Sequence, residues 1–189
     1  MVNAKMIAHL LGNGASYTLY TPQQGTIIGF NVPKHNWHVD YIVILDTMAN
    51  RAMSKQDIKP RATVWCHTDV LEQAQHNKHY PEMFDPVFGD KDARPRRYNG
   101  GHAVVDYIIN NRKPTEIHLW GFDSMFSTDL TSAMDETLPR PNRPPLNNEW
   151  RPHWNTLMAK DSSIQYVLHI PKGKTSEVKA PNLTVQEHS

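Results

Sequence analysis

Residues 97–123 read RYNGGHAVVDYIINNRKPTEIHLWGFD and carry the clearest succession of structural signals in the chain. The Asn-Gly-Gly sequence at 99–101 is typical of a turn. Residues 101–111 place apolar side chains at helical spacing and end in two asparagines. Residues 116–120 form a short apolar run, which is typical of a buried strand, and Gly-Phe-Asp follows at 121–123. The stretch therefore predicts a turn, a helix and a strand in succession.

Other apolar runs of strand length occur on both sides of this stretch, at residues 6–11, 26–30, 41–45, 62–66 and 164–170. The early runs are continuous rather than alternating, which indicates strands covered on both faces, as in parallel sheets. A second helix is expected over residues 149–160. Strands that alternate with helices predict an α/β fold, with a Rossmann-like, mostly parallel sheet flanked by helices.

The length of 189 residues predicts a single domain. We expect this domain to span residues 1–171 and to be followed by a polar C-terminal tail at 172–189. Residues 127–148 contain Pro139, Pro141, Pro144 and Pro145 and show no periodicity. A segment of this length without regular structure is typical of a lid or a disordered loop, so residues 127–148 are predicted to be a proline-rich lid.

The charge balance is close to neutral, with 20 Lys and Arg against 19 Asp and Glu and a formal net charge of +1. A near-neutral chain has no overall electrostatic attraction to duplex nucleic acid or to an anionic membrane. The cluster of Arg94, Arg96 and Arg97 could still form a local basic patch. A duplex nucleic-acid partner is therefore disfavoured but stays open.

The single cysteine, Cys66, excludes an internal disulfide and a multi-cysteine metal site. We expect Cys66 to be a small buried residue rather than a nucleophile. The chain has no apolar stretch long enough to span a membrane and no leader pattern at its N-terminus. These features predict a cytoplasmic protein with no membrane partner.

Ligands of open α/β sheets bind beyond the carboxyl ends of the strands, where this sequence is polar and rich in small residues. The residues at these ends that we consider candidates for ligand binding are Gly12, Asn13, Gly14, Ser16, Asn31, Asp46 and Asp123. Glycines in the turn at 12–16 would let backbone N–H groups cradle a phosphate. The same turn could equally be a tight connection without a ligand, and it lacks the complete G-x-G-x-x-G pattern.

Two further segments contain residues that could bind an anion or act as a general base. Asn99, Gly100 and Gly101 precede the clearest helix, where free N–H groups favour an anion, although an ordinary helix cap has the same sequence. His153 lies at the start of the second predicted helix and could act as a general base. A packed or surface histidine is the alternative interpretation.

In order and spacing, these segments resemble the bacterial sialyltransferases whose N-terminal motif reads G-N-G-P-S, together with related phage and archaeal families. The matching segments are residues 11–16, 28–31, 97–123 and 151–155. The chain has Ala15 in place of the motif proline, Asn99-Gly100 in place of Thr-Ser, and Asp46 in place of an asparagine. Its lid segment lacks the family's tyrosines but contains Arg140 and Arg143.

The resemblance implies a metal-independent glycosyltransferase-like enzyme that moves a group from a nucleotide-activated donor, such as a nucleotide sugar, to a hydroxyl. It implies that the glycine turn, Asn31 and the turn at 99–101 bind the donor. His153 is the implied catalytic base, and Arg97 is a charge partner near the donor phosphate. No tightly bound cofactor is expected, a homo-oligomer stays open, and a bacteriophage origin is implied. The alternatives are a non-catalytic nucleotide- or signalling-molecule-binding protein and a structural phage protein that kept only the fold.

Overall fold

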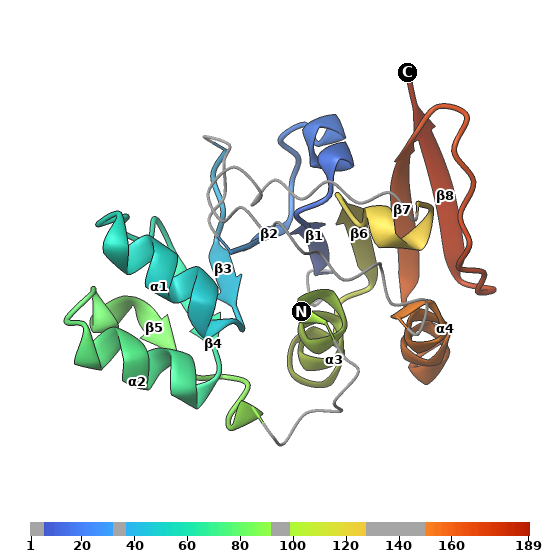
Figure 1. Cartoon of the computed structure of the whole chain (residues 1–189). Coiled ribbons are helices and arrows are strands. Elements are labelled where there is room, and N and C mark those ends of the chain that lie inside the picture. Colours follow the sequence, from blue (N-terminus) through green and yellow to red (C-terminus); the bar gives the residue numbers. More distant parts are fainter. Residues whose placement is uncertain (1–5, 32–36, 92–98, 128–149) are drawn as a thin grey trace.

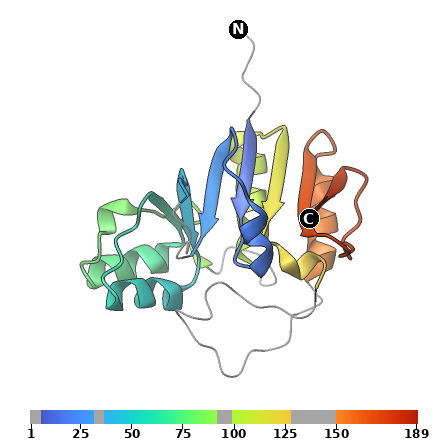
Figure 2. The ribbon, with the colours of Figure 1, turned by 90° about the horizontal axis from the view of Figure 1, so that it is seen from above.

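The computed structural model describes residues 6–31, 37–91, 99–127 and 150–189, which form one open sheet with helices on both faces (Figure 1). The sheet has eight strands in the order β5-β4-β3-β2-β1-β6-β7-β8, and every neighbouring pair is parallel. The arrowheads of β1, β2 and β6 accordingly point the same way (Figure 2). This arrangement confirms the predicted Rossmann-like α/β fold.

The predicted strands are all present, with bounds within about one residue of the apolar runs. They are β1 (Ile7–Leu11), β2 (Thr26–Phe30), β3 (Tyr41–Ile44), β4 (Thr63–Cys66), β6 (Glu116–Trp120) and β7 (Gln165–Pro171). The two predicted helices are α3 (Gly100–Arg112) and α4 (Trp150–Lys160). Short 3-10 helices follow β1 and β6, at η1 (Ala15–Leu19) and η4 (Asp123–Met125).

The structure adds elements that the sequence patterns did not predict. The helices α1 (Thr47–Lys55) and α2 (Thr68–His76) lie between the strands on the β5 side, and η2 (Pro81–Met83) leads into the two-residue strand β5 (Phe84–Asp85). The C-terminal segment is not the predicted tail, because β8 (Leu183–His188) pairs with β7 as the last strand of the sheet. Its residues are mostly exposed, so β8 lacks the apolar run that marks a buried strand.

The two faces of the sheet have separate cores. Alternate side chains point to opposite faces, so Ala8, Leu10 and Leu119 pack with α3 and α4, whereas Ile44 and Cys66 pack with α1 and α2. Figure 1 shows α1 beside α2 at the β3–β5 end of the sheet and α3 beside α4 at the other end. No helix in the described part of the chain is long and apolar enough to cross a membrane.

The strand order reverses between β1 and β6, which lie next to each other at the centre of the sheet. Strands β2 to β5 continue outward from β1 on one side, and β7 and β8 continue from β6 on the other. Such a reversal separates the loops that leave two adjacent carboxyl ends and opens a crevice there. The fold therefore places the expected ligand site at the carboxyl ends of β1 and β6 and of the strands beside them.

Candidate functional site

The glycine turn after β1 is joined directly to the segment after β6. The Gly12 N–H donates to the Trp120 carbonyl at 2.7 Å, and the Gly14 N–H donates to the Gly121 carbonyl at 2.8 Å. A Cβ atom at Gly12 would lie 2.6 Å from the Gly121 oxygen, and one at Gly14 would overlap the Asp123 carboxyl group. These two glycines are therefore required by close contact between two backbone segments.

Asp123 fills the position where we predicted a phosphate. Its carboxylate accepts the Ser16 hydroxyl, and its Oδ2 accepts the Ser16 N–H at 3.2 Å. Asp123 is 9% exposed and Ser16 is 5% exposed. Burial raises the pKa of Asp123, and the hydrogen bonds from Ser16 partly oppose that rise. The turn at 12–16 thus binds an anion, but the anion is a carboxylate of the protein itself.

The start of α3 is held by a reciprocal cap. The Asn99 side chain accepts the His102 N–H at 3.1 Å, and the His102 Nδ1 accepts the Asn99 N–H at 3.1 Å. The other ring nitrogen of His102, Nε2, lies 3.1 Å from the Trp150 carbonyl and must donate to it. Because Nδ1 accepts while Nε2 donates, the hydrogen bonds assign a neutral ring. Burial lowers the pKa of His102 to about 4, which agrees with that assignment.

The cap does not satisfy all of the backbone N–H donors at the beginning of α3. Asn99 and His102 satisfy each other, and the Ala103 N–H donates to the Asn99 carbonyl at 3.1 Å. Within the described residues, the N–H groups of Gly100 and Gly101 have no hydrogen-bond partner. Unpaired N–H groups at the positive end of a helix dipole favour a bound anion. Of the two turns predicted to bind a phosphate, the one at 99–101 is therefore the better supported.

Three aromatic rings, those of Phe30, Phe122 and Trp154, pack against one another next to this turn. Phe30 and Phe122 meet edge to face with centroids 5.9 Å apart, and Phe122 meets Trp154 in the same way at 5.5 Å. A Cβ atom at Gly100 would lie 3.5 Å from Phe30, and one at Gly101 would lie 2.6 Å from Phe122.

Each ring has a candidate polar residue next to it in the chain: Asn31 follows Phe30, Asp123 follows Phe122, and His153 precedes Trp154. The aromatic packing thus brings the chain segments that carry Asn31, Asp123 and His153 close to the start of α3. The His153 ring meets the His102 ring edge to face at 5.8 Å, and His153 is half-buried on the first turn of α4.

The remaining predicted residues fall into three groups. Asp46 lies one strand further out, where its Oδ1 accepts the Met48 N–H at 2.7 Å and caps α1. Asn13 is half-buried within the glycine turn. Arg97, the predicted charge partner, and residues 128–148 of the predicted lid lie outside the described residues.

Two residues at this site were missed by the sequence analysis. The sequence pattern assigns no role to His102, although its position three residues after Asn99 is the spacing of a capping box. Arg151 precedes His153 by two residues, and its guanidinium donates to the carbonyls of Ser124 and Ser127 at 3.0 and 3.3 Å. Arg151 thereby joins α4 to the segment after β6 and adds positive charge to the carboxyl edge of the sheet.

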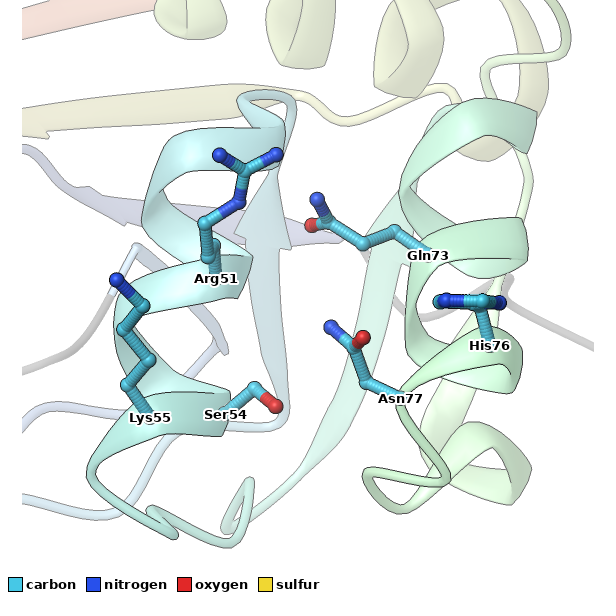
Figure 3. A pocket seen from close by; sticks show the side chains of 6 residues that line it. All are labelled: Arg51, Ser54, Lys55, Gln73, His76 and Asn77. Carbon is cyan, nitrogen blue, oxygen red and sulfur yellow. The ribbon is translucent and has the colours of Figure 1, made fainter.

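Two surface hollows lie away from this site. One of about 500 Å³, shown in Figure 3, opens between α1 and α2 and is lined by Arg51, Ser54, Lys55, Gln73, His76 and Asn77. Lys55 and His76 are in the last turns of their helices, where a basic residue complements the negative end of the helix dipole. The other is lined by residues at the ends of α3 and α4 and by Thr115 before β6. Both hollows are at the amino edge of the sheet, opposite the candidate site.

Within the described ranges, no group of three or more His, Cys, Asp or Glu side chains is arranged to hold a metal ion. Comparisons with protein-family models, with curated proteins and with solved structures found no match to this chain. The class of protein is therefore defined by the fold, an open, all-parallel, Rossmann-like α/β sheet.

Proposed function

We propose that this protein is a transferase that binds a nucleotide-activated donor, such as a nucleotide sugar, and passes the activated group to a hydroxyl acceptor. The observation that carries the proposal is the set of residues around the start of α3. Two N–H groups without a partner in the described structure, an asparagine after β2 and a histidine on α4 are brought together there by Phe30, Phe122 and Trp154. This set offers an anion site and a base in one place.

The geometry favours the turn at 99–101, where the sequence also predicts the donor phosphate, over the glycine turn. Asp123 already accepts the Ser16 N–H and hydroxyl, and its negative charge would repel a phosphate at that turn. The N–H groups of Gly100 and Gly101 remain for the donor phosphate, and the helix dipole of α3 favours its charge. We therefore place the phosphate at α3, with the glycine turn and Asp123 forming the adjoining wall.

His153 is the proposed base. It takes the proton of the acceptor hydroxyl while the acceptor oxygen bonds to the activated carbon and the bond from that carbon to the phosphate oxygen breaks. General-base catalysis of this kind contributes about 10²–10⁴-fold in rate. His102 next to it is neutral in this hydrogen-bond pattern and adds no positive charge to the site.

A second candidate function is nucleotide binding without catalysis. The observation that favours it is the occupation of the glycine turn by Asp123, which leaves a smaller anion site than the resemblance to sialyltransferases implies. A binding protein of this kind would return its ligand chemically intact. The two functions therefore differ in turnover and agree in affinity.

The first experiment is a thermal-shift panel of nucleoside mono- and diphosphates of all five bases, followed by a donor-cleavage assay with sugar derivatives of the base that binds. A ligand at a hundred times its Kd stabilises the protein by about 2.7 kcal/mol. For the transferase, we expect a base-selective shift, and His153→Ala should keep the affinity and lose turnover. Binding with no turnover in the wild type would select the binding protein, and a flat panel would contradict both functions.

The position of the phosphate is tested by a matched pair at Gly100, the first residue of α3. Gly100→Pro removes one N–H donor at a helix position that accepts proline, and Asn99 before it already has extended backbone angles. Gly100→Ala keeps the donor. Loss of a hydrogen bond to a charged group should weaken nucleotide affinity by about tenfold in the proline variant only. Equal affinities in the two variants would exclude the phosphate from this position.

A further inference from the structure

Four of the histidines come together on one face of the sheet, on the side opposite α3 and α4. His9 of β1 is paired in register with His118 of β6, and their rings stack with centroids 4.5 Å apart. His169 of β7 and His188 of β8 continue the row toward the edge of the sheet. His9 is 1% exposed and His169 is 2% exposed, so the inner part of the row is buried.

Hydrogen bonds join three of these rings to a carboxylate. The His118 Nε2 lies 2.9 Å from Glu116 Oε1, the His118 Nδ1 lies 2.9 Å from His169 Nε2, and the His169 Nδ1 lies 2.8 Å from His188 Nε2. We call Glu116, His118, His169 and His188 the histidine ladder. It crosses three strands, and β8, the strand at its end, is held in the sheet by β7 alone.

The distances assign one set of tautomers when the three histidine rings are neutral. The His118 Nε2 donates to the carboxylate of Glu116, so its Nδ1 must accept from His169 Nε2. The His169 Nδ1 must then accept from His188 Nε2. In this pattern, each of the three rings donates its Nε2–H toward Glu116. Each nitrogen that faces a neighbouring ring takes part in one hydrogen bond. The Nδ1 of His188 is the only ladder nitrogen that this pattern leaves over.

Few charged groups near the ladder could stabilise a protonated histidine ring. On its own face, His9 lies against the ladder and Tyr20 lies beyond His9. The short helix η1, which carries Tyr17, also packs against β6 and β7. The His9 Nδ1 accepts the Trp120 indole N–H at 3.3 Å, and its Nε2 lies 3.1 Å from the Gln24 carbonyl, so this ring is also used on both sides. Glu187 of β8 lies on the opposite face, where it accepts the Gly173 N–H. Glu116 is thus the one carboxylate of the ladder.

Trp120 covers the centre of the ladder. Its ring is parallel to that of His169 within 4°, with centroids 3.3 Å apart. Burial lowers the pKa of His169 to about 3, and the neighbouring histidines lower it further in the same direction. Burial likewise lowers the pKa values of His118 and His9. The docked sheet therefore favours neutral rings.

The docked ladder can take up one added proton with its hydrogen bonds intact, because one ring nitrogen at its end is unused. A second added proton would place N–H groups on both His169 Nδ1 and His188 Nε2, which face each other, and would oppose a donor with a donor. Separation of β8 from β7 removes this conflict. A freed histidine has a pKa of about 6.5, so the detached state binds one more proton than the docked state at pH values below this.

We propose that the histidine ladder is a pH-sensitive latch that keeps β8 docked on β7 while its rings are neutral and releases the strand on acidification. Proton linkage explains why β8 is released at low pH rather than at high pH. The state that binds the extra proton gains about tenfold in relative population for each pH unit below about 6.5. Between pH 6.5 and 4.5, detachment of β8 should therefore become about fiftyfold more frequent.

The test is backbone hydrogen exchange of the full chain at several pH values, expressed as protection factors so that the intrinsic pH dependence of exchange is removed. We expect protection of residues 183–188 to fall about fiftyfold between pH 6.5 and 4.5, while β3 and β4 change much less. Constant protection of β8 would overturn the proposal. An equal loss of protection in β3 and β4 would show global unfolding and would also overturn it.

His169→Gln is the decisive variant, since a glutamine amide can donate to His118 and accept from His188 but does not titrate. The matched control is His76→Gln, which changes an exposed histidine on α2 outside the ladder. We expect the pH dependence of β8 protection to flatten to less than threefold in His169→Gln and to persist in His76→Gln. Persistence in both variants would assign the pH dependence to other groups and reject the latch.

Imidazole nitrogen NMR of the wild type keeps the proposal testable if His169→Gln fails to fold. At neutral pH, His118 and His169 should both carry the proton on Nε2, and His169 and His188 should both be charged only as β8 loses protection. A proton on Nδ1 of His118 at neutral pH, or charged rings at both His169 and His188 under a protected β8, would contradict the ladder.

Discussion

The carboxylate of Asp123 accepts both the backbone N–H and the hydroxyl of Ser16, across 107 residues of sequence. This contact joins the turn after β1 to the segment after β6 at the point where the strand order of the sheet reverses. It supplies the negative charge that the start of η1 favours. Under the proposed function, the carboxylate makes the glycine turn part of the wall of the site and would direct a phosphate toward α3.

Asp123→Asn should change how stability depends on pH. The folded-state pKa of Asp123 is raised above its usual value of 3.8, so the fold favours the protonated acid. Relative to the variant, the wild type should be most stable below about pH 4 and should lose that advantage as pH rises through the raised pKa. Urea unfolding of both proteins from pH 3 to pH 8 measures the difference.

Asp161→Asn is the control for this prediction because hydrogen bonds from Ser163 lower the pKa of Asp161. The wild-type advantage over this second variant should be present above about pH 4 and lost at lower pH, which is the opposite sign. The same sign for both positions would disprove the role that we give to burial at Asp123.

Gly101→Ala should destabilise the protein by about 1–3 kcal/mol, because the added methyl group would lie 2.6 Å from Phe122 in a packed core. Gly100→Ala is the matched control, since its methyl group would lie 3.5 Å from Phe30, an ordinary contact. Alanine has the higher helix propensity, so this control should be neutral or up to about 1 kcal/mol more stable. Chemical denaturation compares the two, and equal effects would refute the packing of α3 against Phe122.

His102→Gln should reduce the sensitivity of the protein to mild acid. The pKa of His102 is lowered to about 4, so its contribution to stability is present above about pH 6.5 and is lost as pH falls toward 4. The wild type should lose roughly 3 kcal/mol more than the variant over this range. Unfolding free energies at pH 7 and pH 4.5 measure it, with His76→Gln as a control that should follow the wild type.

Cys66 should be unreactive in the native protein. Its side chain is buried at the end of β4, and burial raises the pKa of the thiol to about 12. Thiolate is the reactive form, so a disulfide reagent at pH 8 should label the native protein only as fast as the protein unfolds. Denaturant should give one thiol per chain at once. Rapid labelling of the native protein would contradict the packing of β4.

Much of the fold could be predicted because the apolar runs that form buried strands are local in sequence. Residues 41–45 form a continuous apolar run, since a parallel strand is covered on both faces. The helices α1 and α2 were missed because each has only nine residues and little apolar surface. Strand β8 was missed because an edge strand with exposed side chains has no apolar run to mark it.

The chemistry available at the carboxyl edge can be recognised in the amino-acid sequence, because glycines, asparagines and His153 follow or adjoin the apolar runs that end there. How those residues are used depends on the tertiary structure. The pairing of Asp123 with Ser16 and the stacking of His9 on His118 join residues more than a hundred positions apart. Such contacts depend on strand order and register, which arise from packing the whole sheet and leave no local pattern in the chain.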